Sequence, residues 1–82
     1  MSDPVTREGL MAQHVLDDEI FQSSVLELEK NTITQWRSAK TVEERERAHA
    51  DLMALGRVVG KLRMLVERAA FEKARQEKDK PQ

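Results

Sequence analysis

The feature that most constrains the fold is a stretch without proline near the C-terminus, residues 42–77, in which apolar residues recur at alternating spacings of three and four. This heptad pattern is typical of a long helix that packs along one seam. At 1.5 Å per residue, such a helix would be about 54 Å long. The residues of its seam are Leu52, Leu55, Val59, Leu62, Val66 and Ala69, and all of them except Ala69 are also expected to belong to the interface with another chain.

Two helices are predicted before it. The first covers residues 4–15, because Asp3 is a capping residue and Pro4 suits the first turn of a helix. The second covers residues 18–39, because the acidic run from Asp17 to Glu19 suits a helix N-terminus and an apolar stripe follows it. This second helix would be about 33 Å long, much shorter than the third.

The third helix has its own start signal. Thr41 and Glu44 have the spacing of a capping box, in which each side chain accepts a hydrogen bond from a free backbone amide near the other residue. The helix is therefore expected to begin at residue 42. We expect one helical domain over residues 1–77 and a charged flexible tail over residues 78–82.

These elements predict an all-α fold, an antiparallel helical hairpin that turns near residue 40. Trp36 and Phe21 are expected to be core plugs between the second and third helices. The short first helix is expected to fold back over Leu62 to Val66 through Met11, Val15 and Leu16, while the rest of the third helix projects. An 82-residue chain without cysteine has a small core, so we expect oligomerisation to complete a bundle.

Two glycines lie inside the third helix, where each costs about 1 kcal/mol relative to alanine. On a helical projection Gly56 and Gly60 lie about 60° and 100° around the axis from Val59, outside the seam. Small residues four apart allow another helix to approach closely. Beside the seam, the third helix therefore has a second strip that is predicted to contact another helix. The strip consists of Met53, Gly56, Gly60 and Met64.

The glycines have two interpretations. They make room for a bulky side chain of the same chain, such as Trp36 or Met11, or they admit a helix of another chain. The heptad on a helix longer than its partner favours the second interpretation, most simply a two-fold dimer that forms a four-helix bundle. The charged residues beside the glycines exclude a membrane partner, so we expect a homo-oligomer in water.

No catalytic, metal or cofactor site is predicted. His14 and His49 are on different helices without a partner at ligand spacing. The acidic run at residues 17–19 is interpreted as a helix cap, and the Ser23-Ser24 pair has no nearby histidine or glycine elbow. The sequence therefore favours a protein that binds over one that catalyses.

Charge is divided unevenly along the chain, since residues 1–36 carry a net −5 and residues 37–82 a net +4. A basic stripe opposite the seam makes phosphate contact an alternative function, that of a small nucleic-acid-associated regulator. Glutamates interrupt this stripe, and no helix-turn-helix layout accompanies it. The stripe consists of Arg57, Lys61, Arg68 and Arg75.

The sequence shows neither the pattern of a membrane span nor that of a signal peptide. No run reaches the roughly 18 uncharged apolar residues that a membrane span needs. The first residues lack the basic and then apolar layout of a signal peptide. We therefore expect a cytoplasmic protein without a membrane partner.

One order of motifs stands out over residues 15–66. An aspartate-started helix with an apolar pair is followed by a tryptophan, a turn with threonine, an Arg-Glu pair and a leucine-rich helix. This order resembles a family of short, uncharacterised helical proteins encoded by tailed bacteriophages and prophages. The matching positions are Asp17, Ile20, Phe21, Trp36, Thr41, Arg45, Glu46, Leu52, Leu55 and Leu62.

The resemblance implies a virion or head-assembly accessory, located in the bacterial host or in the virion, and it brings no catalytic residues. Together with the residue patterns it favours an assembly adaptor that self-associates and binds phage structural proteins. A phage-encoded inhibitor of a host protein would use the same helix surface and stays an alternative.

Overall fold

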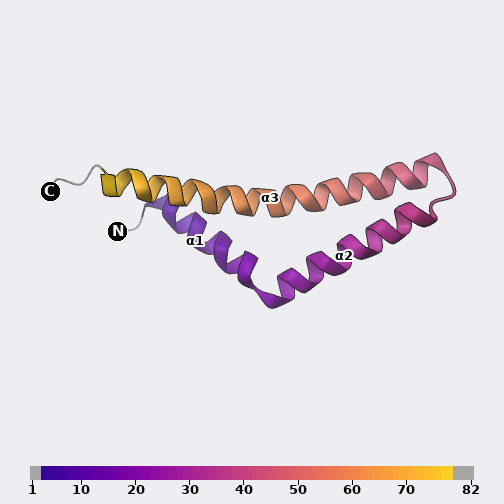
Figure 1. Ribbon diagram of the computed structural model, residues 1–82, viewed down its shortest axis with the longest axis horizontal. Coiled ribbons are helices and arrows are strands. Elements are labelled where there is room, and N and C mark those ends of the chain that lie inside the picture. Colours follow the sequence, from indigo (N-terminus) through magenta and orange to yellow (C-terminus); the bar gives the residue numbers. More distant parts are fainter. Residues whose placement is uncertain (1–2, 79–82) are drawn as a thin grey trace.

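The computed structural model describes residues 3–78, and the regular structure in that range is entirely helical (Figure 1). The all-α class is therefore confirmed. Its helices are α1 (Pro4–Asp17), α2 (Glu19–Ser38) and α3 (Val42–Lys78). Lys78, expected in the tail, is the last residue of α3, and the remaining expected tail, residues 79–82, lies outside the described residues.

Aspartate side chains cap the first two helices. The Oδ1 atom of Asp3 accepts a hydrogen bond of 2.9 Å from the backbone N–H of Val5. In the same way, Oδ1 of Asp18 accepts one of 2.8 Å from the backbone N–H of Phe21. Each bond satisfies an amide that has no partner inside its own helix.

The capping box of α3 forms with one difference from the prediction. Thr41 Oγ1 accepts from the backbone N–H of Glu44 at 3.1 Å, as expected. The Glu44 carboxylate, however, accepts from the backbone N–H of Lys40 at 2.9 Å rather than from that of Thr41. The reciprocal bond is thus shifted by one residue toward the N-terminus.

The two shorter helices both run opposite to α3, and they meet at an angle whose corner, at Asp18, stands away from α3 (Figure 1). At one end, Gln76 of α3 donates a hydrogen bond of 2.7 Å to Asp3, just before α1. At the other end, Trp36 of α2 and Ala48 of α3 line the same cavity. With 14 and 20 residues, α1 and α2 together are nearly as long as the 37 residues of α3.

This arrangement corrects the expectation that α3 projects far beyond the other helices. The chain bends at Asp18, whose backbone is extended with φ −68° and ψ 127°. The Gln22 side chain stabilises the bend by donating to the Leu16 carbonyl at 2.7 Å. Because of this bend, the chain returns to α3 beyond the first residue of α2, and the start of α1 reaches Gln76 of α3.

The contact between α1 and α3 is made by small residues. Gly9 and Ala12 of α1 and Ala69 of α3 are buried. A Cβ atom at Gly9 would collide with Cβ of Ala69 and lie 2.9 Å from the Leu65 carbonyl oxygen. The two backbones therefore approach too closely for larger side chains between them.

The predicted packing face of α1 is consequently wrong in most of its members. Met11 and Val15 are exposed, and only Leu16 of the expected residues is partly buried. The physical reason is the close approach at Gly9, which turns the small residues toward α3 and the large ones outward. The contact includes Leu65 of the expected stretch from Leu62 to Val66 and extends beyond it toward the C-terminus of α3, to Ala69 and Gln76.

The three helices form a single layer. The molecule measures 65 × 24 × 15 Å, so its shortest dimension is less than a quarter of its longest. Its radius of gyration is 18.0 Å, whereas a compact domain of this length has about 12 Å. Most domains bury their apolar faces between two layers, and here the second layer is missing.

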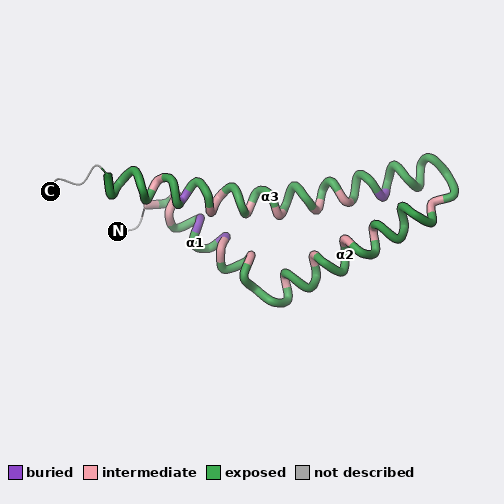
Figure 2. Tube along the Cα trace, viewed as in Figure 1, coloured by how far each residue is buried: buried purple, intermediate pink, exposed green. Residues whose placement is uncertain are grey.

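Burial is correspondingly slight (Figure 2). Within residues 3–78, the buried residues are Gly9, Ala12, Ala48 and Ala69. The accessible surface is 7063 Å², whereas a globular monomer of 9.4 kDa has about 5,000 Å². The chain thus exposes about 2,000 Å² more than a globular monomer of its mass would.

The expectation of a tryptophan core plug is wrong for the single chain. Trp36 is 47% exposed, and Phe21 is only partly buried. Both side chains lie at the contact of α2 with α3. A layer one helix thick has nothing above this contact, so a large aromatic ring there stays in water.

Candidate functional site

The glycines of α3 lie in an unbroken helix with free space around them. A single α-helix runs from Val42 to Lys78 and includes both positions. A Cβ atom added at Gly56 or at Gly60 would have no neighbour within 4 Å. The interpretation that the glycines make room for Trp36 or Met11 is therefore wrong.

One side of the layer carries these glycines, and we call it the glycine face. On the helical projection its α3 residues lie about 60–100° from Val59, which faces α2, so they are nearly perpendicular to the layer. Met53 and Met64 flank them and are 53% and 47% exposed. The α3 residues of the glycine face, all exposed, are His49, Gly56, Gly60 and Glu67.

A groove between α2 and α3 opens beside this face near the closed end of the chain, with a volume of about 330 Å³. Its α2 side combines two apolar side chains with Thr32 and Arg37, and its α3 side includes His49. The exposed ring of Trp36 contributes to its wall. Besides Thr32, the groove is lined by Ile33, Trp36, Arg37, Ala48, His49 and Leu52.

A second groove of about 410 Å³ lies further along the same face, next to the bend between α1 and α2. Leu26 on α2 and Arg63 on α3 belong to it, and Leu26 is exposed. Phe21 and Val59 also line this groove, and both are partly buried. The two grooves extend the apolar surface of the glycine face from α3 onto α2.

The opposite side of the layer, the Val58 face, has fewer exposed large apolar side chains along α2 and α3. Its groove of about 440 Å³ has two exposed large apolar side chains, Leu28 and Val58. Asp51 and Gln35 line the same groove. The glycine face therefore carries more exposed large apolar side chains than the grooved part of the Val58 face.

The predicted seam lies inside the chain. Its members are partly buried or buried, and they face α1 and α2. Their partial burial is the consequence of a single layer, in which each seam residue is covered from one direction. These residues are Leu52, Leu55, Val59, Leu62, Val66 and Ala69.

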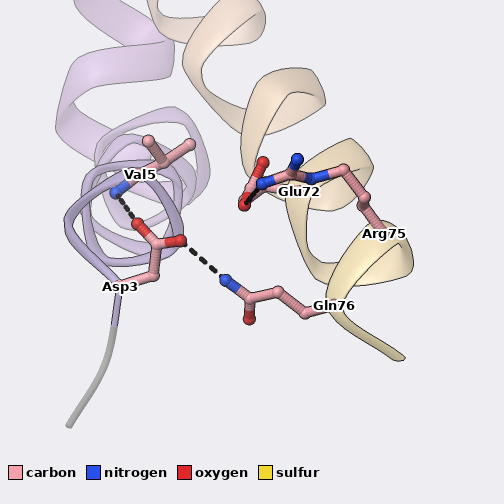
Figure 3. A network of polar contacts seen from close by, with 5 residues as sticks. All are labelled: Asp3, Val5, Glu72, Arg75 and Gln76. Atoms are coloured by element: carbon pink, nitrogen blue, oxygen red, sulfur yellow. Dashed lines mark hydrogen bonds and ion pairs between the residues drawn. The ribbon is translucent and has the colours of Figure 1, made fainter. Parts of the chain in front are cut away.

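The basic stripe lies along the outer edge of α3, opposite α2. Its four residues are exposed and lie about 160–200° from Val59. Arg75 forms an ion pair with Glu72, with Nη2 2.7 Å from Oε1 (Figure 3). The other members are Arg57, Lys61 and Arg68.

The groups considered for chemistry have structural roles or stand apart. Asp18 caps α2, and the Ser23 hydroxyl donates to the Ile20 carbonyl at 3.1 Å. His14 and His49 are exposed on different helices. Between residues 3 and 78, no group of three or more histidine and carboxylate side chains is arranged to hold a metal ion.

Sequence reasoning missed two parts of this surface. It did not identify Gly9 as the glycine at a close helix contact, although Gly9 and Ala12 are small residues three apart, on one side of α1. It also did not place Leu26 and Ile33 beside the glycine strip. The sequence shows that Leu26 and Ile33 are seven residues apart and that Trp36 follows three residues later. It does not show on which side of the layer these residues lie.

The chain matches no family model, no curated protein and no solved structure. Over residues 3–78, each helix is too short or too polar to serve as a membrane span.

Proposed function

We propose that this chain is a non-enzymatic protein–protein interaction module that self-associates through α3. The observation that carries the proposal is the single layer of helices, which leaves an accessible surface of 7063 Å². The excess of about 2,000 Å² over a globular monomer is comparable to what one chain buries in an obligate homodimer, about 1,000–2,500 Å². A second layer would give the chain the core that it lacks by itself.

The biological setting is part of the same proposal. We infer a phage or prophage structural or assembly adaptor subunit that acts in the bacterial cytoplasm or in the virion. The support is the resemblance carried by Asp17, Trp36, Thr41 and the leucines of α3, together with an apolar surface suited to protein contacts. Exposed methionines such as Met53 and Met64 adapt readily to different partners.

The first experiment measures solution mass by light scattering over a concentration series. We expect the wild type to form a discrete dimer or higher oligomer. The double variant Gly56→Leu/Gly60→Leu should be a folded monomer, because leucine side chains would hold a facing helix away. Circular dichroism at the same concentrations shows whether the variant keeps its helices.

The matched control is Arg57→Leu/Lys61→Leu, which adds side chains of the same kind at the same spacing on the outer edge of α3. It should keep the wild-type mass. A wild type that is monomeric at every concentration would overturn the self-association. A double glycine variant with wild-type mass would overturn the role of the strip.

The partner is tested by affinity capture of the tagged chain from bacteria that produce phage particles. An adaptor should recover structural proteins of the particle. Recovery of a single host protein instead would replace the adaptor with the inhibitor alternative.

The basic stripe supports a second candidate, a nucleic-acid-associated regulator. Arg57, Lys61 and Arg68 are exposed in a row on the outer edge, away from the glycine face. Phosphate binding would weaken steeply with added salt, whereas contact through apolar side chains would not. Titration of duplex DNA at two salt concentrations distinguishes the two functions.

A further inference from the structure

We propose that a second copy of this chain covers the glycine face, with the two α3 helices antiparallel and crossing midway between Gly56 and Gly60. The inference rests on the proposed self-association and adds to it the surface, the direction and the register. Three features support it: the exposed apolar side chains of this face, the large accessible surface of the single chain, and the positions of the charged residues along α3.

The surface itself selects this face over the opposite one. The glycine face combines Met53 and Met64 on α3 with Leu26, Ile33 and Trp36 on α2, all of them exposed. The groove of the Val58 face offers two such side chains, Leu28 and Val58. A face-to-face pair of layers would bury the glycine face of both chains at once and give each a two-layer architecture.

The register follows from a symmetry in the positions along α3. Residues 49, 53, 56, 60, 63 and 67 on this side follow one another at spacings of four, three, four, three and four. This order is the same read in either direction, as a two-fold contact between identical helices requires. An antiparallel pair centred at residue 58 places Gly56 of each copy over Gly60 of the other.

The glycines make such a crossing close. Neither position has a neighbour within 4 Å of where a Cβ would be, so a second backbone has free access there. Where two small residues meet two others, the helix axes can approach more nearly than large side chains allow. The cost of about 1 kcal/mol for each helical glycine is then offset by contacts of the second copy.

The charges favour the antiparallel direction. In this register His49 of one copy lies opposite Glu67 of the other, and Arg37 lines the same groove as His49. The Glu67 carboxylate of the second copy would thus approach two nitrogen-bearing side chains that can donate to it. A parallel pair would instead place Glu67 opposite Glu67 and Arg63 opposite Arg63, and like charges at a contact are unfavourable.

The test uses cysteine cross-linking, which is clean because the chain contains no cysteine. The variant is His49→Cys/Glu67→Cys, with both positions exposed. Within one helix these residues are about 27 Å apart, so a disulfide, whose Cα atoms lie about 4.4–6.8 Å apart, forms only between chains. We expect this variant to become a covalent dimer under mild oxidation, and neither single variant to do so.

The matched control is Arg57→Cys/Arg75→Cys, which has the same separation of 18 residues on the outer edge of α3. It should stay uncrosslinked. Adding Gly56→Leu/Gly60→Leu to the test variant should abolish its cross-link. Circular dichroism confirms in each case that the helices are retained.

The outcomes separate this inference from the proposed function. A wild type that light scattering finds to be monomeric overturns both. A dimeric wild type whose test variant forms no cross-link overturns the register and leaves the self-association standing. Cross-linking of either single variant would show a parallel pair, and cross-linking of the control would place the contact on the outer edge; either result overturns the inference.

Discussion

The two shorter helices meet α3 in different ways. α1 approaches it closely, with Gly9 and Ala12 buried against Ala69 and a hydrogen bond of 2.7 Å from Gln76 to Asp3 (Figure 3). α2 is longer, yet none of its residues from Glu19 to Ser38 is buried, and open grooves accompany its contact with α3. The difference follows from side-chain size, since small residues let backbones meet and large ones hold them apart.

The comparison also separates two uses of glycine. Gly9 is enclosed by Ala69 and Leu65 of its own chain, whereas Gly56 and Gly60 face open space. A glycine that is enclosed fixes an internal contact. A glycine that faces open space inside a helix lowers helix stability and forms no close contact within its own chain. A contact with another chain would offset that loss.

The largest expected effect comes from filling the enclosed glycine. Gly9→Leu should lower the free energy of unfolding by about 2 kcal/mol, because overpacking costs about 1–3 kcal/mol and more where backbone must move. The Leu65 carbonyl is such a backbone group. Urea unfolding followed by circular dichroism measures the loss, at concentrations below those at which light scattering detects association.

The control for this variant is the same substitution at an open glycine. Gly56→Leu should raise the stability of the monomer by about 0.5–1 kcal/mol, because leucine is the better helix former. Equal destabilisation at the two positions would contradict the distinction between enclosed and open glycines.

A smaller effect is expected at the end of the α1 contact. Asp3→Ala removes both the cap on Val5 and the acceptor for Gln76, so it should lower stability by about 1 kcal/mol. Gln76→Ala removes only the bond between the helices and should cost a few tenths of a kcal/mol, since that bond is exposed. Thermal unfolding of the two variants compares them, and an equal loss for both would show that the cap contributes nothing.

Local patterns predicted the helices well because their causes are local. Asp3, Asp18 and Thr41 cap the helices that their positions indicated, and the heptad of α3 faces the other helices. These features depend on neighbours within one turn of helix. They are therefore readable from a few residues at a time.

The layer could not be predicted, because it depends on the bend at Asp18 and on contacts between distant residues. An amphipathic pattern indicates which side of α1 is apolar, but the close approach at Gly9 and Ala69 decides which side faces α3. The expected core role of Trp36 assumed a second layer that a single chain does not provide. The glycine strip was readable on α3, whereas its continuation onto α2 through Leu26 and Ile33 required the positions of both helices.

The smallest predicted effect concerns α2 alone. Since α2 buries no residue, we expect it to open more easily than α1, in a local unfolding step of the monomer. Ser24 is exposed in α2, and Ser24→Ala should stabilise that helix by about 0.5 kcal/mol through helix propensity. Amide hydrogen exchange should then slow about twofold in α2 and stay unchanged around Ala12 of α1. If the amides of both helices slowed together, α1 and α2 would unfold as one unit, and their different contacts with α3 would have no counterpart in stability.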